Sequence, residues 1–136
     1  GLGAFTARDK NVSVSALAVV NAVGDVVAQD GSVVAGTTAD NPTRQTSWTN
    51  DEPSSNTVLA LVTVEANLGK RSVRWLAMRG SDGITVSVRP AHTPYDGDVV
   101  FAVATPTTTD VEPDLDLLGY LSTEAVAGAV RAAVAA

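Results

Sequence analysis

Cysteine is absent from this chain of 136 residues, which excludes disulfides, thiol nucleophiles and thiolate-bound metals. The single histidine, His92, excludes metal motifs that need two histidines. Aromatic residues make up only 4% of the chain, so the core must be built from Val, Ala and Leu. No apolar run approaches the ~20 residues of a membrane span, and the first residues show no basic region followed by an apolar one. We therefore expect a soluble, cytoplasmic protein with no membrane partner.

Positive charge is also sparse. The formal net charge is −6, and the nine Lys and Arg residues are scattered along the chain, which argues against a nucleic acid partner. The length suits one domain, and no internal repeat is present. Because the chain begins at Gly1 rather than at methionine, we expect it to be the back part of a longer precursor.

Apolar runs and alternating patterns predict the strands. The alternation that starts at Val12 and ends at Asn21 predicts a strand entering a buried sheet. The Asp-Gly pair at 30–31 predicts a hairpin between short strands at 26–28 and 33–35. Residues 57–65 read as a buried strand, and the continuous apolar run 99–105 is typical of a strand buried on both faces.

Two helices are expected. Asn67 is a candidate N-cap for the first helix, and Gly80 and Gly83 are expected to weaken the end of that helix. The second is expected to begin near Ser122, a good N-cap. Its apolar residues Val126, Val130 and Val134 recur every fourth position, and the rest of the helix is mostly Ala and Gly, so it can approach a neighbour closely.

The pair Asn56-Thr57 lies at an abrupt change in composition. The preceding segment, 37–55, is rich in Pro, Ser, Thr, Asn and Asp, which predicts an exposed, cleavable loop, whereas an apolar run follows. If the bond breaks, Thr57 becomes an N-terminal residue whose α-amine can act as the base for its own hydroxyl. The side chain of Asn56 could help polarise the carbonyl that is attacked. Taken alone, the pair also fits an ordinary boundary between a loop and a strand.

The polar loop 89–98 leads into the apolar run 99–105 and contains a second group of candidate residues. Asp96 and Asp98, separated by one glycine, could position an ammonium group, hold a cation or share a proton, or they could be solvated turn residues. His92 is a possible general base, but the interpretation we favour is a neutral residue that forms hydrogen bonds within the loop. The amide of Asn21, at the end of its strand, could stabilise an oxyanion or simply accommodate a turn.

The acidic run Asp110, Glu112, Asp114 and Asp116 alternates like a calcium loop. Its sixth position is Leu115 where such a loop needs glycine, so we expect a solvated loop instead.

Three segments together resemble one enzyme family. They are residues 88–105 (VRPAHTPYDGDVVFAVAT), residues 56–63 (NTVLALVT) and residues 14–24 (VSALAVVNAVG). In order and spacing they are similar to the self-cleaving family of L-aminopeptidase/D-esterases, β-aminopeptidases and nylon-oligomer endohydrolases. The Asn-Thr pair most resembles the nylon-oligomer hydrolase branch.

The resemblance implies a fold and a set of roles. It implies an α/β fold, a four-layer αββα sandwich with two sheets between helix layers, of which this chain is the C-terminal part. Residues 1–36 would end the large subunit, 37–56 would link it to the cleavage site, and 57–136 would form the small subunit. Thr57 would be the nucleophile, Asn21 a donor to the oxyanion or to the nucleophile, and Asp96 and Asp98 active-site acids. The missing N-terminal half of the precursor would supply one sheet and further active-site side chains, including a lysine or tyrosine.

We therefore predict an amide hydrolase that matures by cutting Asn56-Thr57 and needs no metal or organic cofactor. Its substrate would be a small peptide, an amino-acid amide or an ω-amino acid oligomer, and a homo-oligomer of cleaved protomers is expected. Two alternatives remain. One is a non-catalytic subunit or binding module in which the bond stays intact. The other is an acyltransferase related to the ornithine acetyltransferases.

Overall fold

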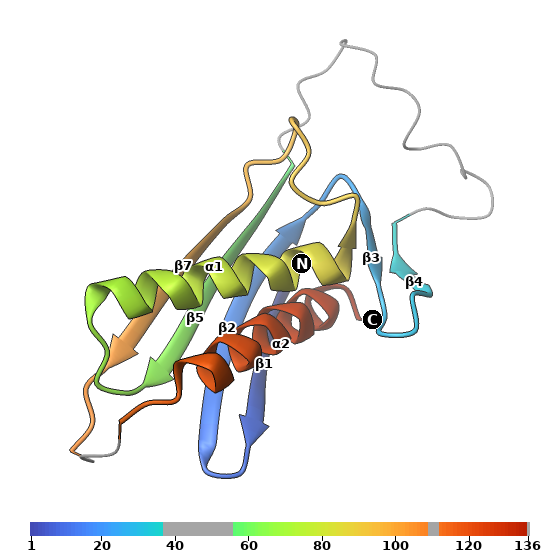
Figure 1. The fold of residues 1–136 in the computed structure, drawn as a ribbon. Coiled ribbons are helices and arrows are strands. Elements are labelled where there is room, and N and C mark those ends of the chain that lie inside the picture. Colours follow the sequence, from blue (N-terminus) through green and yellow to red (C-terminus); the bar gives the residue numbers. More distant parts are fainter. Residues whose placement is uncertain (37–55, 109–111, 136) are drawn as a thin grey trace.

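A four-stranded sheet is the centre of the molecule (Figure 1). The computed structural model describes residues 1–36, 56–108 and 112–135, so the predicted loop 37–55 lies outside the described residues. Strands lie in the order β1–β2–β5–β7, antiparallel except for the β5–β7 pair, which is parallel. Their bounds are β1 (Leu2–Asp9), β2 (Val12–Asn21), β5 (Thr57–Glu65) and β7 (Val99–Thr105).

Strand β1 precedes the first strand that the sequence predicted. It pairs with β2 from Leu2 to Asp9, along its whole length. Its helix-facing positions include Gly3 and Ala7, which are buried but small, so the strand shows little hydrophobic alternation. The two strands 12–21 and 57–65 were predicted correctly.

A second, smaller sheet flanks the first. It contains β3 (Asp25–Val27), β4 (Val33–Ala35) and the two-residue β6 (Val88–Arg89), in the order β4–β3–β6. The predicted hairpin is confirmed, with Gly31 at a φ of 85° in its turn. The hydroxyl and backbone N–H of Ser32 donate to the carboxylate of Asp30 and lower the pKa of that carboxyl.

Both helices cover the same face of the four-stranded sheet (Figure 1). Helix α1 (Lys70–Ser87) packs on β5 and β7, and α2 (Leu115–Val134) packs on β1 and β2. Strands β2 and β5 turn every second side chain towards the helices. These buried residues are Val14, Ala16, Ala18 and Val20 in β2, and Val58, Ala60, Val62 and Val64 in β5.

Helix α1 differs from the prediction at both ends. Its N-cap is Gly69, with no side-chain cap, while Asn67 instead exchanges hydrogen bonds with Thr107. It also continues through Gly80 and Gly83 to Ser87. A Cβ at Gly83 would lie 2.5 Å from the carbonyl oxygen of Thr123, so this glycine allows α1 to touch α2. The gain in packing offsets the low helix propensity of glycine.

Helix α2 begins at Leu115, about two turns before the predicted cap. Its N-cap is Asp114, whose side chain accepts the N–H of Leu117. Ser122 lies inside the helix and is buried, with its hydroxyl donating to the carbonyl of Leu118. The prediction of a cap at Ser122 was therefore wrong, because a serine can satisfy its hydroxyl on the preceding turn. Asp114 and Asp116 likewise belong to the helix start rather than to a solvated loop.

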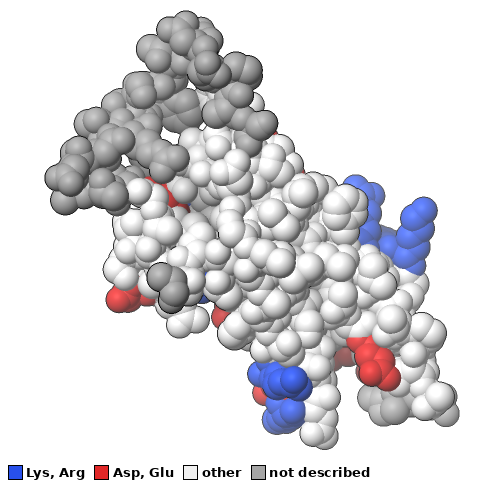
Figure 2. Space-filling view, turned by 180° about the vertical axis from the view of Figure 1, so that it is seen from behind, with Lys and Arg blue, Asp and Glu red and all other residues white. Residues whose placement is uncertain are grey.

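The other face of the sheet is bare in the sense that no helix or strand among the described residues covers it. Figure 2 shows this side as a broad surface with few charges, which lie mostly at its margins. The prediction that strand 99–105 is buried on both faces was wrong, since Phe101 is 60% exposed. The exposed apolar side chains of this face are Leu2, Leu17, Val19, Leu59, Val99, Phe101 and Val103.

Candidate active site at the start of strand β5

The candidate residues meet at one end of the four-stranded sheet, where β2 ends and β5 begins. Asn21, the last residue of β2, is the cross-strand partner of Thr57, the first residue of β5. On the other side, Asn56 forms a parallel bridge with Asp96. The sheet register therefore brings together segments that lie far apart in the sequence.

The hydroxyl of Thr57 lies against the carbonyl of the bond before it. Oγ1 of Thr57 donates to the carbonyl oxygen of Asn56 at 2.6 Å. The backbone N–H of Gly97 donates to the same oxygen at 2.9 Å. A Cβ on Gly97 would lie 3.1 Å from Oγ1 of Thr57, so a side chain there would crowd the hydroxyl. This carbonyl is thus next to a hydroxyl and polarised by a backbone donor.

Asp98 is nearly buried and fully engaged within the protein. Its side chain is 4% exposed. One oxygen, Oδ1, accepts the N–H of Val58 at 2.8 Å. The other, Oδ2, lies 2.8 Å from Nδ1 of His92 and accepts the backbone N–H of that residue at 3.3 Å.

Asp96 accepts hydrogen bonds from its own loop and from the turn between β2 and β3. Its Oδ2 accepts the hydroxyl of Thr93 at 2.7 Å and the N–H of Thr93 at 3.0 Å. Its Oδ1 accepts the N–H of Val23 at 3.5 Å. The backbones also approach closely here, because a Cβ on Gly24 would lie 2.2 Å from the carbonyl oxygen of Pro90. Both acids therefore have hydrogen-bond partners within the protein.

His92 lies between the loop and helix α1. Besides Asp98, its ring contacts Ser81, with Nε2 3.2 Å from the serine Oγ. It has the backbone conformation of a left-handed turn, with a φ of 54°. This arrangement fits the interpretation that His92 forms hydrogen bonds within the loop.

Sequence reasoning missed the backbone donors of the site. Side-chain chemistry pointed to Asn56, Thr57 and the two acids, but the N–H groups of Val58 and Gly97 carry no residue-specific signal. The nearest hint was the glycine between Asp96 and Asp98, at a position where a side chain would meet Thr57. The arrangement provides a hydroxyl, an adjacent polarised carbonyl and an oriented carboxylate.

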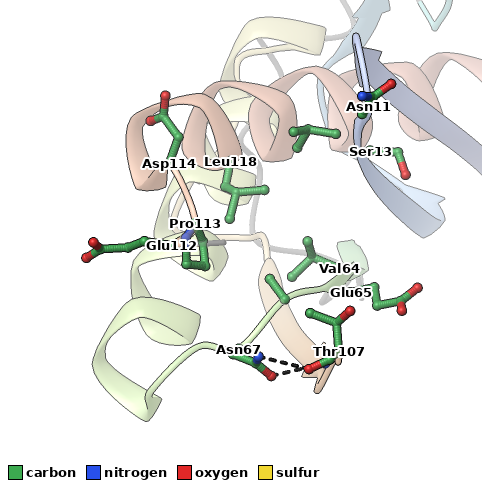
Figure 3. A pocket seen from close by; sticks show the side chains of 12 residues that line it. Asn11, Ser13, Val64, Glu65, Asn67, Thr107, Glu112, Pro113, Asp114 and Leu118 are labelled. Atoms are coloured by element: carbon green, nitrogen blue, oxygen red, sulfur yellow. Dashed lines mark hydrogen bonds between the residues drawn. The ribbon is translucent and has the colours of Figure 1, made fainter. Parts of the chain in front are cut away.

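A pocket of about 630 Å³ lies at the opposite end of β5 (Figure 3). The polar residues among those that line it include Glu65, Asn67, Thr107, Glu112 and Asp114, and Asn67 forms two hydrogen bonds with the backbone of Thr107. None of the candidate catalytic residues lines it. Within ranges 1–36, 56–108 and 112–135, no three His, Cys, Asp or Glu side chains gather as metal ligands. Neither of the two described helices is long and apolar enough to cross a membrane.

Comparison with known proteins identifies the family. The model of Peptidase family S58 matches residues 3–136, so the chain belongs to that family. An uncharacterized aminopeptidase of Mycobacterium bovis is 39% identical over 69 residues, which are 51% of this chain and 20% of the relative. An uncharacterized aminopeptidase of Mycobacterium leprae is 44% identical over 50 residues, which are 37% of this chain and 14% of the relative.

Two solved structures share the fold over nearly the whole chain. One is the L-aminopeptidase D-Ala-esterase/amidase of Ochrobactrum anthropi, described as a variant of the Ntn hydrolase fold, with a TM-score of 0.67 and 20% identity. The other is the PH0078 protein of Pyrococcus horikoshii, with a TM-score of 0.67 and 18% identity. Each comparison covers 98% of this chain but only 39% of the solved chain. The expectation of an α/β fold that is part of a larger sandwich is thus confirmed.

Proposed function

We propose that this member of Peptidase family S58 is an N-terminal-nucleophile amide hydrolase that cuts its own bond between Asn56 and Thr57. The observation that carries the proposal is the contact of the Thr57 hydroxyl with the Asn56 carbonyl oxygen at 2.6 Å, beside the N–H of Gly97. Family membership and the aminopeptidase names of the relatives support the reaction class.

Maturation begins when Oγ1 of Thr57 attacks the carbonyl carbon of Asn56. Negative charge then develops on the carbonyl oxygen, where the N–H of Gly97 already donates. The C–N bond breaks, the nitrogen of Thr57 takes the hydroxyl proton, and an ester joins Asn56 to Oγ1. Water hydrolyses this ester, which leaves a carboxylate on Asn56 and a free amine and hydroxyl on Thr57.

The mature site uses the same hydroxyl on a substrate. The amine of Thr57 takes the hydroxyl proton, and Oγ1 attacks the substrate amide. Asn21, directly across from Thr57 in the sheet, donates to the tetrahedral oxygen. The leaving amine takes the proton, and water then releases the acyl group from Oγ1. Asp98 orients the start of β5 through Val58, and Asp96 holds the loop that carries Gly97.

The substrate class we propose is a small peptide, an amino-acid amide or an ω-amino acid oligomer. The Ochrobactrum anthropi protein is named an aminopeptidase and amidase, which supports small amides. The bare apolar face of the sheet supports a further layer, which we assign to the N-terminal half of the precursor. We propose that cleaved protomers then assemble into a homo-oligomer.

The test is the intact mass of freshly produced full-length protein under denaturing conditions. The wild type and Thr57→Ser are expected to give two fragments, the smaller beginning at residue 57. The variant Thr57→Val, which has nearly the same shape but no hydroxyl, is expected to stay as one chain. Thr63→Val, a matched change on the same strand and face, is expected to be cut like the wild type.

Three outcomes would overturn the proposal. A wild-type chain that stays intact during prolonged incubation would favour the binding-module alternative. A cleaved chain that passes acyl groups to an added amine in preference to water would favour the acyltransferase. Cleavage of Thr57→Val at the wild-type rate would remove Thr57 as the nucleophile.

A further inference from the structure

His92 connects the loop of the two acids to helix α1. Its Nδ1 lies 2.8 Å from Oδ2 of Asp98, and its Nε2 lies 3.2 Å from Oγ of Ser81. These contacts have the outline of a Ser-His-Asp triad. Ser81, however, lies inside α1, where backbone N–H groups are bonded to carbonyls one turn back, so none is free to hold an oxyanion. These contacts therefore do not form a catalytic triad, and their role depends on what Asp98 binds.

Asp98 takes the place of a missing strand partner. Strand β7 begins at Val99, which pairs with Leu59, so the preceding residue of β5, Val58, has no partner in β7. The N–H of Val58 donates instead to Oδ1 of Asp98 at 2.8 Å. This bond orients the backbone immediately after Thr57.

The direction of that bond depends on the other oxygen of Asp98. His92 supplies two donors to Oδ2, its ring Nδ1 at 2.8 Å and its backbone N–H at 3.3 Å. The Asp98 side chain is 4% exposed, so water cannot readily replace these donors. The carboxylate is thus held at both oxygens, by Val58 on one side and by His92 on the other.

We propose that His92 is a positioning residue: through Asp98 it holds the amide of Val58, and thereby keeps the hydroxyl of Thr57 against the carbonyl of Asn56. This inference rests on the proposed function, which makes that hydroxyl the nucleophile. It differs from a general base, because the ring of His92 contacts Asp98 and Ser81, and acts on Thr57 through Asp98.

The contact is compatible with either protonation state of the ring. A neutral ring with its proton on Nδ1 donates to Asp98 and accepts the hydroxyl of Ser81 at Nε2. A protonated ring donates from both nitrogens, and the carbonyl oxygen of Ser81 lies 3.4 Å from Nε2. Ser81 therefore steadies the ring in both states.

Backbone conformation selects the test variants. Glycine and asparagine both tolerate the positive φ of 54° at His92. His92→Asn keeps an N–H donor near the position of Nδ1 but loses the contact with Ser81, whereas His92→Gly loses both. Lys10→Gly is the matched control, because Lys10 has a φ of 51° in the turn between β1 and β2, away from the site.

The first measurement is the rate of self-cleavage of the full-length protein, by intact mass. His92→Gly is expected to slow cleavage about tenfold or more, because small displacements of a reacting group are costly. His92→Asn is expected to stay within about threefold of the wild type, since it restores the donor to Asp98. Lys10→Gly should leave the rate unchanged. Melting temperatures of the uncleaved chains verify that the variants are folded.

The second measurement does not depend on cleavage. In the Thr57→Val background, His92→Gly should accelerate hydrogen exchange of the Val58 amide, and His92→Asn should not. Equal cleavage by His92→Gly and wild type, or equally slow cleavage by His92→Gly and His92→Asn, would overturn the inference while the proposed function stands. An uncleaved wild type would overturn the proposed function, and the Val58 exchange rates would still decide whether His92 fixes that amide.

Discussion

The two faces of the four-stranded sheet differ in side-chain size and in what covers them. The face under the helices is built from small residues, such as Ala18 and Val62, which are completely buried. The opposite face carries larger ones, such as Leu17, which is 44% exposed, and Phe101. Most of the larger apolar side chains of the sheet therefore lie on its bare side, and the exception is Phe5, whose ring lies beside Gly128 of α2.

The covered face stabilises this chain, whereas the bare face is available for packing against another layer of protein. Small residues let α1 and α2 lie close to the strands, so the covered face needs close packing rather than large side chains. Burial of each Leu or Phe of the bare face would contribute roughly 1.5–3 kcal/mol. Contiguous apolar surfaces of this kind mark interaction sites. The contrast is the physical argument for a second sheet over the bare face.

The largest effect is expected from a charge on the covered face. Val62→Asp would place a carboxylate among apolar residues that offer it no donor, and it should destabilise the chain by about 4 kcal/mol or more. Leu17→Asp is the matched change on the bare face, where water can reach the charge. We expect it to cost less than about 1 kcal/mol in the 136-residue chain.

Denaturant unfolding followed by circular dichroism measures both changes. An equal loss of unfolding free energy from Leu17→Asp and Val62→Asp would show that the two faces are equally buried. That result would contradict the difference between the faces.

A second test addresses how closely the covering helices approach each other. Gly83→Ala adds a Cβ that would lie 2.5 Å from the carbonyl oxygen of Thr123, so the helices must move apart. We expect a loss of about 1–3 kcal/mol in the free energy of unfolding. Gly69→Ala is the control, because nothing lies within 4 Å of its added Cβ. A gain in stability from Gly83→Ala, as helix propensity alone would give, would show that close approach is not required.

The fold could be predicted where one residue pattern determined one element. Strands β2 and β5 followed from alternation and apolar runs, and the β3–β4 hairpin from Asp30-Gly31. Strand β1 was missed because its buried positions are Gly3 and Ala7, and burial of β7 was overestimated because an apolar run does not show which face is covered. The start of α2 was misplaced because Ser122 and Asp114 are both capable caps, and only packing decides between them.

The candidate site was predictable in its side chains and not in its backbone. Thr57, Asn21 and the acids Asp96 and Asp98 were selected by residue type and by resemblance, and the sheet register then brings them together. The N–H groups of Gly97 and Val58, and the link from His92 to Asp98, depend on how a loop folds against the end of β5. Such contacts have no sequence pattern, and the roles of these residues stay predictions until cleavage is measured.

The smallest effect on stability is expected from Leu17→Cys on the bare face, which should change the free energy of unfolding by less than about 1 kcal/mol in the 136-residue chain. Because the 136-residue chain has no cysteine of its own, the new thiol is the only one in that chain, and in the full-length protein its reaction is followed by the mass of the peptide that contains position 17. Met78→Cys is the control, since Met78 is 54% exposed on α1, in the helix layer on the opposite side.

In the 136-residue chain both thiols should react with iodoacetamide at similar rates. In the full-length protein a covering sheet should slow the reaction at position 17 about tenfold or more and leave position 78 unchanged, because a buried thiol is inert. Equal rates in the full-length protein would show that the face stays bare and that no second layer packs there.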